Sequence, residues 1–112
     1  MFGIHEYVLK PGEDEYEFQR AVRQAEGRGI FKLPGLVDHC FLKGIKGERI
    51  GSYAAIWVFE SREAWEQLWG TLEQPLRKQD YPENWKVWEE EVLAPFLDRQ
   101  PDTITFTAYE EV

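Results

Sequence analysis

Two histidines are the residues of this sequence best suited to move protons near neutral pH. His5 and His39 fall in apolar segments of strand-like composition, at positions of the same parity. Because imidazole titrates close to physiological pH, we take these two side chains as the candidate catalytic residues. The residues leave an alternative open, in which each imidazole only satisfies a hydrogen bond at an interface or a strand end.

Aromatic residues predict a cavity around these histidines. Several share the parity of the histidines, and two tryptophan pairs in the second half of the chain have helical spacings of four and three residues. Such stripes usually pack in a core, but this concentration of indoles could also hold a flat hydrophobic molecule. The candidate ligand-binding residues are Tyr7, Tyr53, Trp57, Trp65, Trp69 and Trp88.

Other catalytic and metal-binding patterns are weak in this sequence. Cys40, the single cysteine, has apolar neighbours and is predicted to be a buried small hydrophobe. Glu6 and Asp38 interrupt apolar strands, and we expect these two carboxylates to lie near strand edges, where solvent reaches them. The sequence has no zinc-type Cys/His spacing, no phosphate loop leading into a helix and no Ser/His/Asp elbow. We therefore expect neither a metal nor a cofactor.

Composition limits the class of protein and its partners. The chain has 112 residues, a formal net charge of −8 and 15% aromatic residues, which predicts one soluble domain over 1–112. A negative field repels phosphate backbones and anionic lipid surfaces, so nucleic acids and membranes are poor candidate partners. The sequence contains neither an apolar run of membrane-spanning length nor a leader-like segment, and we expect a cytoplasmic location.

The elements that must position the candidate residues are predicted in the order β-α-β-β-α-α-β. Strands are predicted over 2–10, 36–45, 53–59 and 103–109. Helices are predicted after the acidic run 13–15, after the N-cap Ser61, and over 83–98. Without the extra helix, this order is the ferredoxin-like βαββαβ plan, an α+β fold whose antiparallel sheet has helices on one face.

Both faces of the predicted sheet are apolar. One parity is mainly aliphatic and includes Ile4, Ile56 and Phe106, whereas the other is mainly aromatic and includes the histidines. Helices can cover only one face, and the other would exceed the roughly 300–600 Å² of the largest apolar patch on a monomer. We therefore expect a homodimer with two sheets packed face to face. The alternative is a monomer whose third helix and C-terminal tail cover the second face.

Three segments carry a resemblance to a known family. They are the opening 5–12 (HEYVLKPG), the entry to the second strand at 33–36 (LPGL), and 58–61 (VFES), which runs into the second helix. In this order and spacing they resemble the dimeric α/β-barrel superfamily, which includes the stress-responsive barrel proteins and the antibiotic-biosynthesis monooxygenase-like proteins.

This resemblance implies a homodimer whose two sheets form a barrel, with a pocket between sheet and helices in each subunit. Members include cofactor-independent oxygenases, polyketide cyclases and haem-degrading enzymes. His5 matches the strand-one histidine of the stress-responsive branch, which lines the pocket in the cyclase members.

Two function hypotheses from different classes follow. In the first, the protein is a cofactor-independent, monooxygenase-like enzyme for a hydrophobic or aromatic small molecule. There His5 or His39 moves a proton, and the conjugated substrate supplies the electrons. In the second, the protein is a non-catalytic ligand-binding or structural homodimer, and the histidines satisfy hydrogen bonds only.

Overall fold

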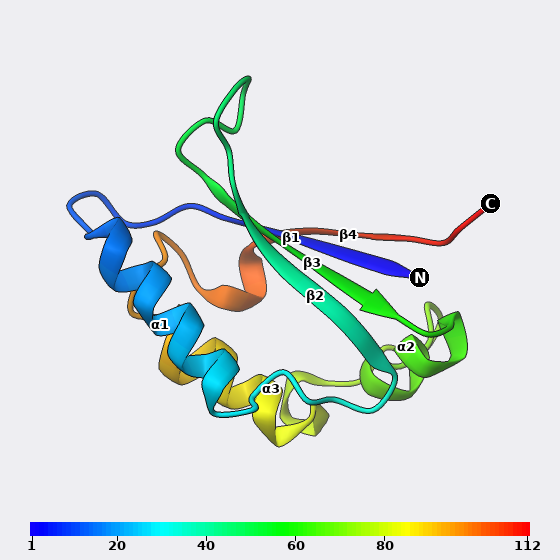
Figure 1. Ribbon diagram of the computed structural model, residues 1–112. Coiled ribbons are helices and arrows are strands. Elements are labelled where there is room, and N and C mark those ends of the chain that lie inside the picture. The colour runs from blue at the N-terminus through cyan, green and yellow to red at the C-terminus, as the bar shows by residue number, and fades with distance from the viewer.

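A four-stranded antiparallel sheet with helices on one side forms the fold (Figure 1). The computed structural model describes residues 1–112, except that only the backbone of residue 102 is described. The predicted α+β class and antiparallel sheet are confirmed, and the strand order β2-β3-β1-β4 is compatible with a ferredoxin-like fold. The strands are β1 (Phe2–Tyr7), β2 (Leu36–Lys43), β3 (Tyr53–Phe59) and β4 (Thr105–Tyr109).

Two side-chain caps begin the main helices. The Asp14 carboxylate accepts a hydrogen bond from the backbone N–H of Tyr16, and the Ser61 hydroxyl accepts one from that of Ala64. Each cap satisfies an N–H that has no partner within the helix. The helical segments are α1 (Glu15–Gly27), α2 (Arg62–Trp69), the 3₁₀ turn η1 (Lys78–Asp80), α3 (Glu83–Val87), the π-helix η2 (Trp88–Leu93) and the 3₁₀ turn η3 (Pro101–Thr103).

The third predicted helix is the least regular element. It begins as α3 and continues as η2, where the carbonyl of Glu89 accepts a hydrogen bond from the backbone N–H five residues later. This wider turn inserts one extra residue. The predicted stripe continued through Val92 and Phe96, but these are only partly buried, and Leu93 and Leu97 are the core positions. The buried face has therefore moved along the chain by one residue.

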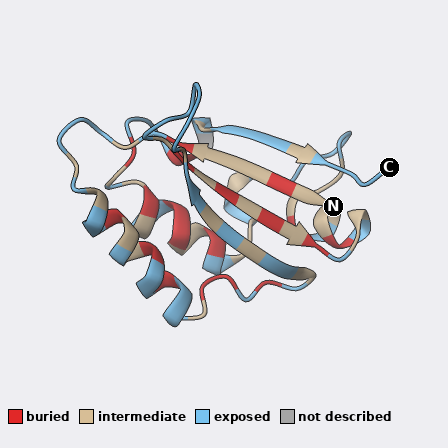
Figure 2. Ribbon diagram, turned by 45° about the horizontal axis from the view of Figure 1, so that its top comes forward, coloured by how far each residue is buried: buried red, intermediate tan, exposed pale blue. Residues whose placement is uncertain are grey.

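The aromatic parity of the sheet faces the helices, as the buried positions in Figure 2 show. Tyr7 and Trp57 lie there with almost no exposed surface. The aliphatic assignment of Phe106 is wrong, because Phe106 pairs with His5 in the β1–β4 register and directly opposed side chains share a face. Their ring centroids are 5.6 Å apart.

The opposite face of the sheet carries aliphatic side chains that the described elements leave uncovered. Its middle row consists of Cys40, Ile56, Ile4 and Thr107, one residue from each strand. Cys40 is exposed, so its predicted burial is wrong. The third helix lies on the other side of the sheet and does not cover this row (Figure 1). Among the described helices, none has the length and apolarity to cross a bilayer.

Candidate functional site

An aromatic cavity lies between the sheet and the second half of the chain. Its volume is about 160 Å³, and it is partly open to solvent. Strands β1, β3 and β4 form one side, whereas α2, α3 and η2 form the other. The lining residues are Gly3, His5, Trp57, Phe59, Trp65, Trp69, Tyr81, Trp85, Glu89, Pro101, Ile104 and Phe106.

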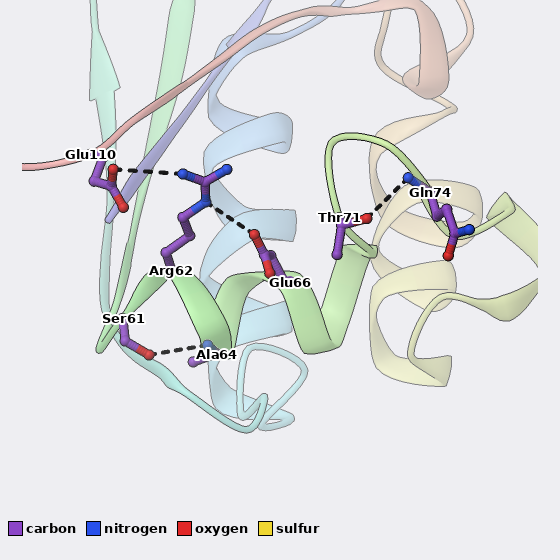
Figure 3. Close-up of polar contacts among 7 residues, drawn as sticks. All are labelled: Ser61, Arg62, Ala64, Glu66, Thr71, Gln74 and Glu110. Atoms are coloured by element: carbon purple, nitrogen blue, oxygen red, sulfur yellow. Dashed lines mark hydrogen bonds and ion pairs between the residues drawn. The ribbon is translucent and has the colours of Figure 1, made fainter.

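Helix α2 brings two of the predicted tryptophans, Trp65 and Trp69, to this cavity. The Arg62 guanidinium at the start of α2 contacts the Glu66 carboxylate at 3.0 Å and that of Glu110, beyond β4, at 3.8 Å (Figure 3). Exposed ion pairs stabilise a fold little. The effect of the Arg62–Glu110 contact is geometric, because it connects α2 to the end of the strand that supplies Phe106.

At the junction of α3 and η2, some side chains face the cavity and others face the core. Trp85 and Glu89, four residues apart, line the cavity. Trp88 lies between them in sequence and is fully buried in the core, with its ring centroid 4.8 Å from that of Phe31 and 5.5 Å from that of Phe41. Trp88 thus contributes to packing, and Trp85, its neighbour on the same turn, takes the place in the cavity wall predicted for it.

The rings of the cavity wall meet at steep angles. Trp85 lies 5.0 Å from Trp57 at 77° and 5.1 Å from Trp69 at 65°, measured between ring centroids and planes. Trp69 in turn lies 5.2 Å from Tyr81 at 88°. Neighbouring rings therefore form corners, as edge-to-face pairs do, and not a slot between parallel planes.

Gly3 provides part of the empty space. It pairs with Trp57 in the β1–β3 register, on the face where the cavity lies. A methyl group at Gly3 would lie 3.8 Å from the side chains of both Phe59 and Trp57, which is ordinary van der Waals contact. A longer side chain at this position would extend into the cavity.

His5 is held in one tautomer by the neighbouring indole. The Trp57 Nε1–H donates to His5 Nδ1 at 3.1 Å. Because an indole N–H can only donate, Nδ1 must be unprotonated, and the proton of the neutral ring is on Nε2. Burial lowers the pKa of His5 to about 4. At neutral pH His5 is therefore a weak base and a hydrogen-bond donor through Nε2.

We expect stability to fall as pH decreases from about 6.5 towards 4, because over this window the unfolded chain binds a proton at His5 that the folded chain excludes. The contribution of neutral His5 is fully present above pH 6.5, and about 2 kcal/mol of it is lost by pH 5. Urea denaturation at pH 7 and pH 5 will measure this loss in the wild-type protein and in His5→Gln. Carboxylates titrate in both proteins, so an equal loss in the two would show that His5 does not contribute.

The second histidine, His39, lies outside the cavity lining. Its ring stacks on Trp57 at 5.8 Å and 23°, and its Nε2 is 3.9 Å from a Glu26 carboxylate oxygen. Trp57 thus contacts both candidate histidines, but of the two only His5 lines the cavity. His39 joins β2 to α1, and the catalytic role predicted for it stays a prediction.

The two predicted tyrosines also lie outside the lining. Burial raises the pKa of Tyr7 well above its usual range; the negative charge of Glu89 adds to this effect and the Trp88 side chain opposes it. Tyr7 is therefore a protonated phenol in the core. The Tyr53 hydroxyl donates to Glu15 at 3.0 Å and so links the sheet to α1.

Several lining residues were not predicted, notably Tyr81, Trp85, Glu89 and Phe106. Trp85 and Glu89 had a usable signal, since their spacing of four residues places them on one helical face. Tyr81 lies in an irregular connection and Phe106 on an edge strand, where the sequence pattern carries no such signal. Within the described residues, there is no cluster of three or more His, Cys, Asp or Glu side chains that could hold a metal ion.

No protein-family model, curated protein or solved structure matches this chain. The cavity geometry and the chemistry of its walls therefore supply the argument for function.

Proposed function

We propose that this protein binds a small organic molecule whose bound part is compact and apolar. The observation that carries the proposal is the cavity of about 160 Å³ lined by four tryptophans. An engineered apolar cavity of about 150 Å³ binds benzene, so this volume suits a group the size of one ring. Aromatic walls supply dispersion contacts over the whole surface of such a group.

One polar contact supports orientation of the ligand. His5 lines the cavity and keeps its proton on Nε2, so it offers a donor to an oxygen or nitrogen acceptor on the ligand. Sites of this kind combine an apolar wall with few placed polar groups. The other ring nitrogen is already engaged by Trp57, which holds the imidazole in place.

Filling the cavity from Gly3 tests this proposal. In the wild-type protein, phenol is expected to shift the NMR signals of the indole N–H groups around the cavity. Gly3→Leu should weaken this binding by about tenfold or more, because the leucine side chain takes the volume the ring would occupy. Gly3→Ala is the matched control and should bind phenol as the wild type does. Unchanged phenol binding by Gly3→Leu would exclude this cavity as the site.

A second candidate function is the cofactor-independent, monooxygenase-like reaction that the family resemblance implies. The observation in its favour is that His5 and the carboxylate of Glu89 line the same cavity, so a donor and a proton acceptor face one bound molecule. In this candidate, His5 stabilises an oxygen anion on the substrate through Nε2–H. Phenolic compounds that bind to the cavity can be tested as substrates by measuring oxygen consumption. Consumption by the wild-type protein that is abolished in His5→Ala would favour the enzyme over the binding protein.

We further propose that two copies pair through the open face of the sheet. The support is the aliphatic middle row, in which Ile4 and Ile56 lie side by side across β1 and β3 with no described element over them. A two-fold pairing of equal faces buries this row without exposing a new one.

Sedimentation at micromolar concentration is expected to give twice the mass of one chain. Ile56→Lys should give the single-chain mass, because it places an ammonium in the centre of the paired faces. Ile50→Lys is the control, since Ile50 is 63% exposed in the hairpin connection away from the middle row. A wild-type protein that sediments as one chain would contradict the pairing.

A further inference from the structure

The charge in the cavity is of one sign. Among the lining residues that the structure describes, Glu89 has the one carboxyl group, and no lysine or arginine lines the cavity. Glu89 is 7% exposed, so its carboxylate belongs to the wall and not to the surrounding solvent. His5, the histidine among these described lining residues, is neutral at pH 7 because burial lowers its pKa to about 4.

The ring arrangement also distinguishes between ligand shapes. A flat ring can contact steeply angled rings edge-to-face, and a rounded cation gains in addition from ring faces that it meets on several sides. Trp57, Trp85, Trp69 and Tyr81 form a continuous series of steep corners, with interplanar angles between 65° and 88°. This geometry favours a rounded group that contacts more than one ring.

We propose that the cavity takes a methylated ammonium group, with tryptophan rings around the methyl groups and Glu89 as the counter-charge. This inference rests on the proposed binding function and names its ligand class. The positive charge of a quaternary ammonium is attracted by the negative faces of aromatic rings. A cation beside Glu89 also favours the ionised carboxylate. The net charge of −8 draws cations towards the protein as a whole.

The same walls select against an unmethylated ammonium. A primary ammonium carries three N–H donors, each of which needs an acceptor when it leaves water. Glu89 and Tyr81 are the lining side chains that can accept such hydrogen bonds, whereas the tryptophan and phenylalanine rings that form most of the wall offer no acceptor and His5 presents a donor. A trimethylammonium group has no N–H to satisfy, so it loses little on leaving water and keeps its charge.

Three small probes test the inference on the wild-type protein. Choline carries the trimethylammonium group, 3,3-dimethylbutan-1-ol is its neutral isostere, and ethanolamine is its unmethylated form. NMR titration of the indole N–H signals should give an affinity for choline about tenfold above that for each of the other two. Choline binding no more tightly than the neutral isostere would overturn the inference, while binding of the isostere or of phenol would still support the proposed function. If none of these compounds binds, both are overturned.

A matched pair of variants isolates the counter-charge. Glu89→Gln should reduce choline binding to that of the neutral isostere and leave binding of the isostere itself unchanged. Glu90→Gln is the control, because it removes the same charge from an exposed position of the same segment. An equal loss of choline affinity in both variants would assign the effect to net charge and overturn the role of Glu89. The comparison of probes on the wild-type protein decides the ligand class even if Glu89→Gln does not fold.

The trimethylammonium group could belong to a free small molecule or to a modified lysine. A short peptide containing trimethyllysine, titrated beside choline, distinguishes these sources. Tighter binding of the peptide than of its unmodified form and of choline assigns the group to a protein. Tighter binding of choline assigns it to a small molecule.

Discussion

Replacing Trp57 with alanine is expected to lower the free energy of unfolding by about 3–5 kcal/mol. Trp57 is 2% exposed at the centre of β3 and contacts rings both in the core and in the cavity wall. Its ring packs against Phe31 and Trp88 in the core and against Trp85 in the cavity wall. Truncation removes these contacts together and leaves a void that the surrounding rings, fixed by one another, cannot close.

Guanidinium denaturation of Trp57→Ala and of Trp65→Ala measures this effect. Trp65 is a suitable comparison because it lines the same cavity but is only partly buried on α2. Trp65→Ala should therefore cost clearly less. If the two variants lose equal stability, Trp57 does not hold the central position in the packing that its contacts indicate.

Trp57→Phe separates packing from hydrogen bonding. Phenylalanine keeps much of the apolar volume but lacks the N–H that donates to His5. The variant should retain more stability than Trp57→Ala. Its His5 ring is no longer held in the Nε2–H tautomer, a change that ¹⁵N shifts of the imidazole report directly.

Gly70→Ala is expected to be the second most damaging substitution. Gly70 ends α2 with φ +86° and ψ 175°, a conformation essentially restricted to glycine, which costs a residue with a side chain about 1–3 kcal/mol. Its methyl group would also lie 2.5 Å from the carbonyl oxygen of Gln74 and 2.8 Å from the carbonyl carbon of Pro75, both of them backbone atoms. Such overpacking adds about 1–3 kcal/mol. The damage falls on the connection that follows Trp69, so binding to the cavity should weaken as well.

Gly12→Ala is the matched control for this prediction. Gly12 has the same φ of +86°, but a methyl group there would have no atom within 4 Å. Urea denaturation of Gly12→Ala gives the cost of a side chain at this positive φ without close contacts, and the additional loss in Gly70→Ala gives the combined cost of the close contacts and of the extended ψ of 175°. Equal losses would show that the segment after Gly70 moves aside without cost.

The regular half of the fold could be predicted from local patterns. Apolar, β-branched and aromatic composition bounded by turn residues identified the strands, and the acidic run 13–15 and the N-cap Ser61 marked where α1 and α2 begin. These signals are short-range, because a cap or a pleat involves neighbouring residues only. The pairing of two copies and the membership of a barrel family stay predictions, since both depend on partners outside this chain.

The irregular half could not be predicted in the same way. Parity assigns faces within one strand, but the face of Phe106 depends on how β4 registers against β1, which the connection from η2 through η3 determines. Of the predicted candidate residues, those that line the cavity lie on regular elements, as His5, Trp57, Trp65 and Trp69 do, and their role as a site stays a prediction. Tyr81 and Phe106 were missed, because chain segments distant in sequence bring them to the cavity.

The extra residue in η2 has a consequence for sequence comparison. In an uninterrupted α-helix each residue advances by about 100°. The wider turn of η2 accommodates the extra residue, so deleting one residue at Glu90 or Glu91, both exposed, would return the segment to regular α-helical spacing and keep Leu93 and Leu97 in the core. In an alignment with a homologue, a one-residue gap between Trp88 and Leu93 would therefore identify a protein with a regular α-helix in this segment and the same core face.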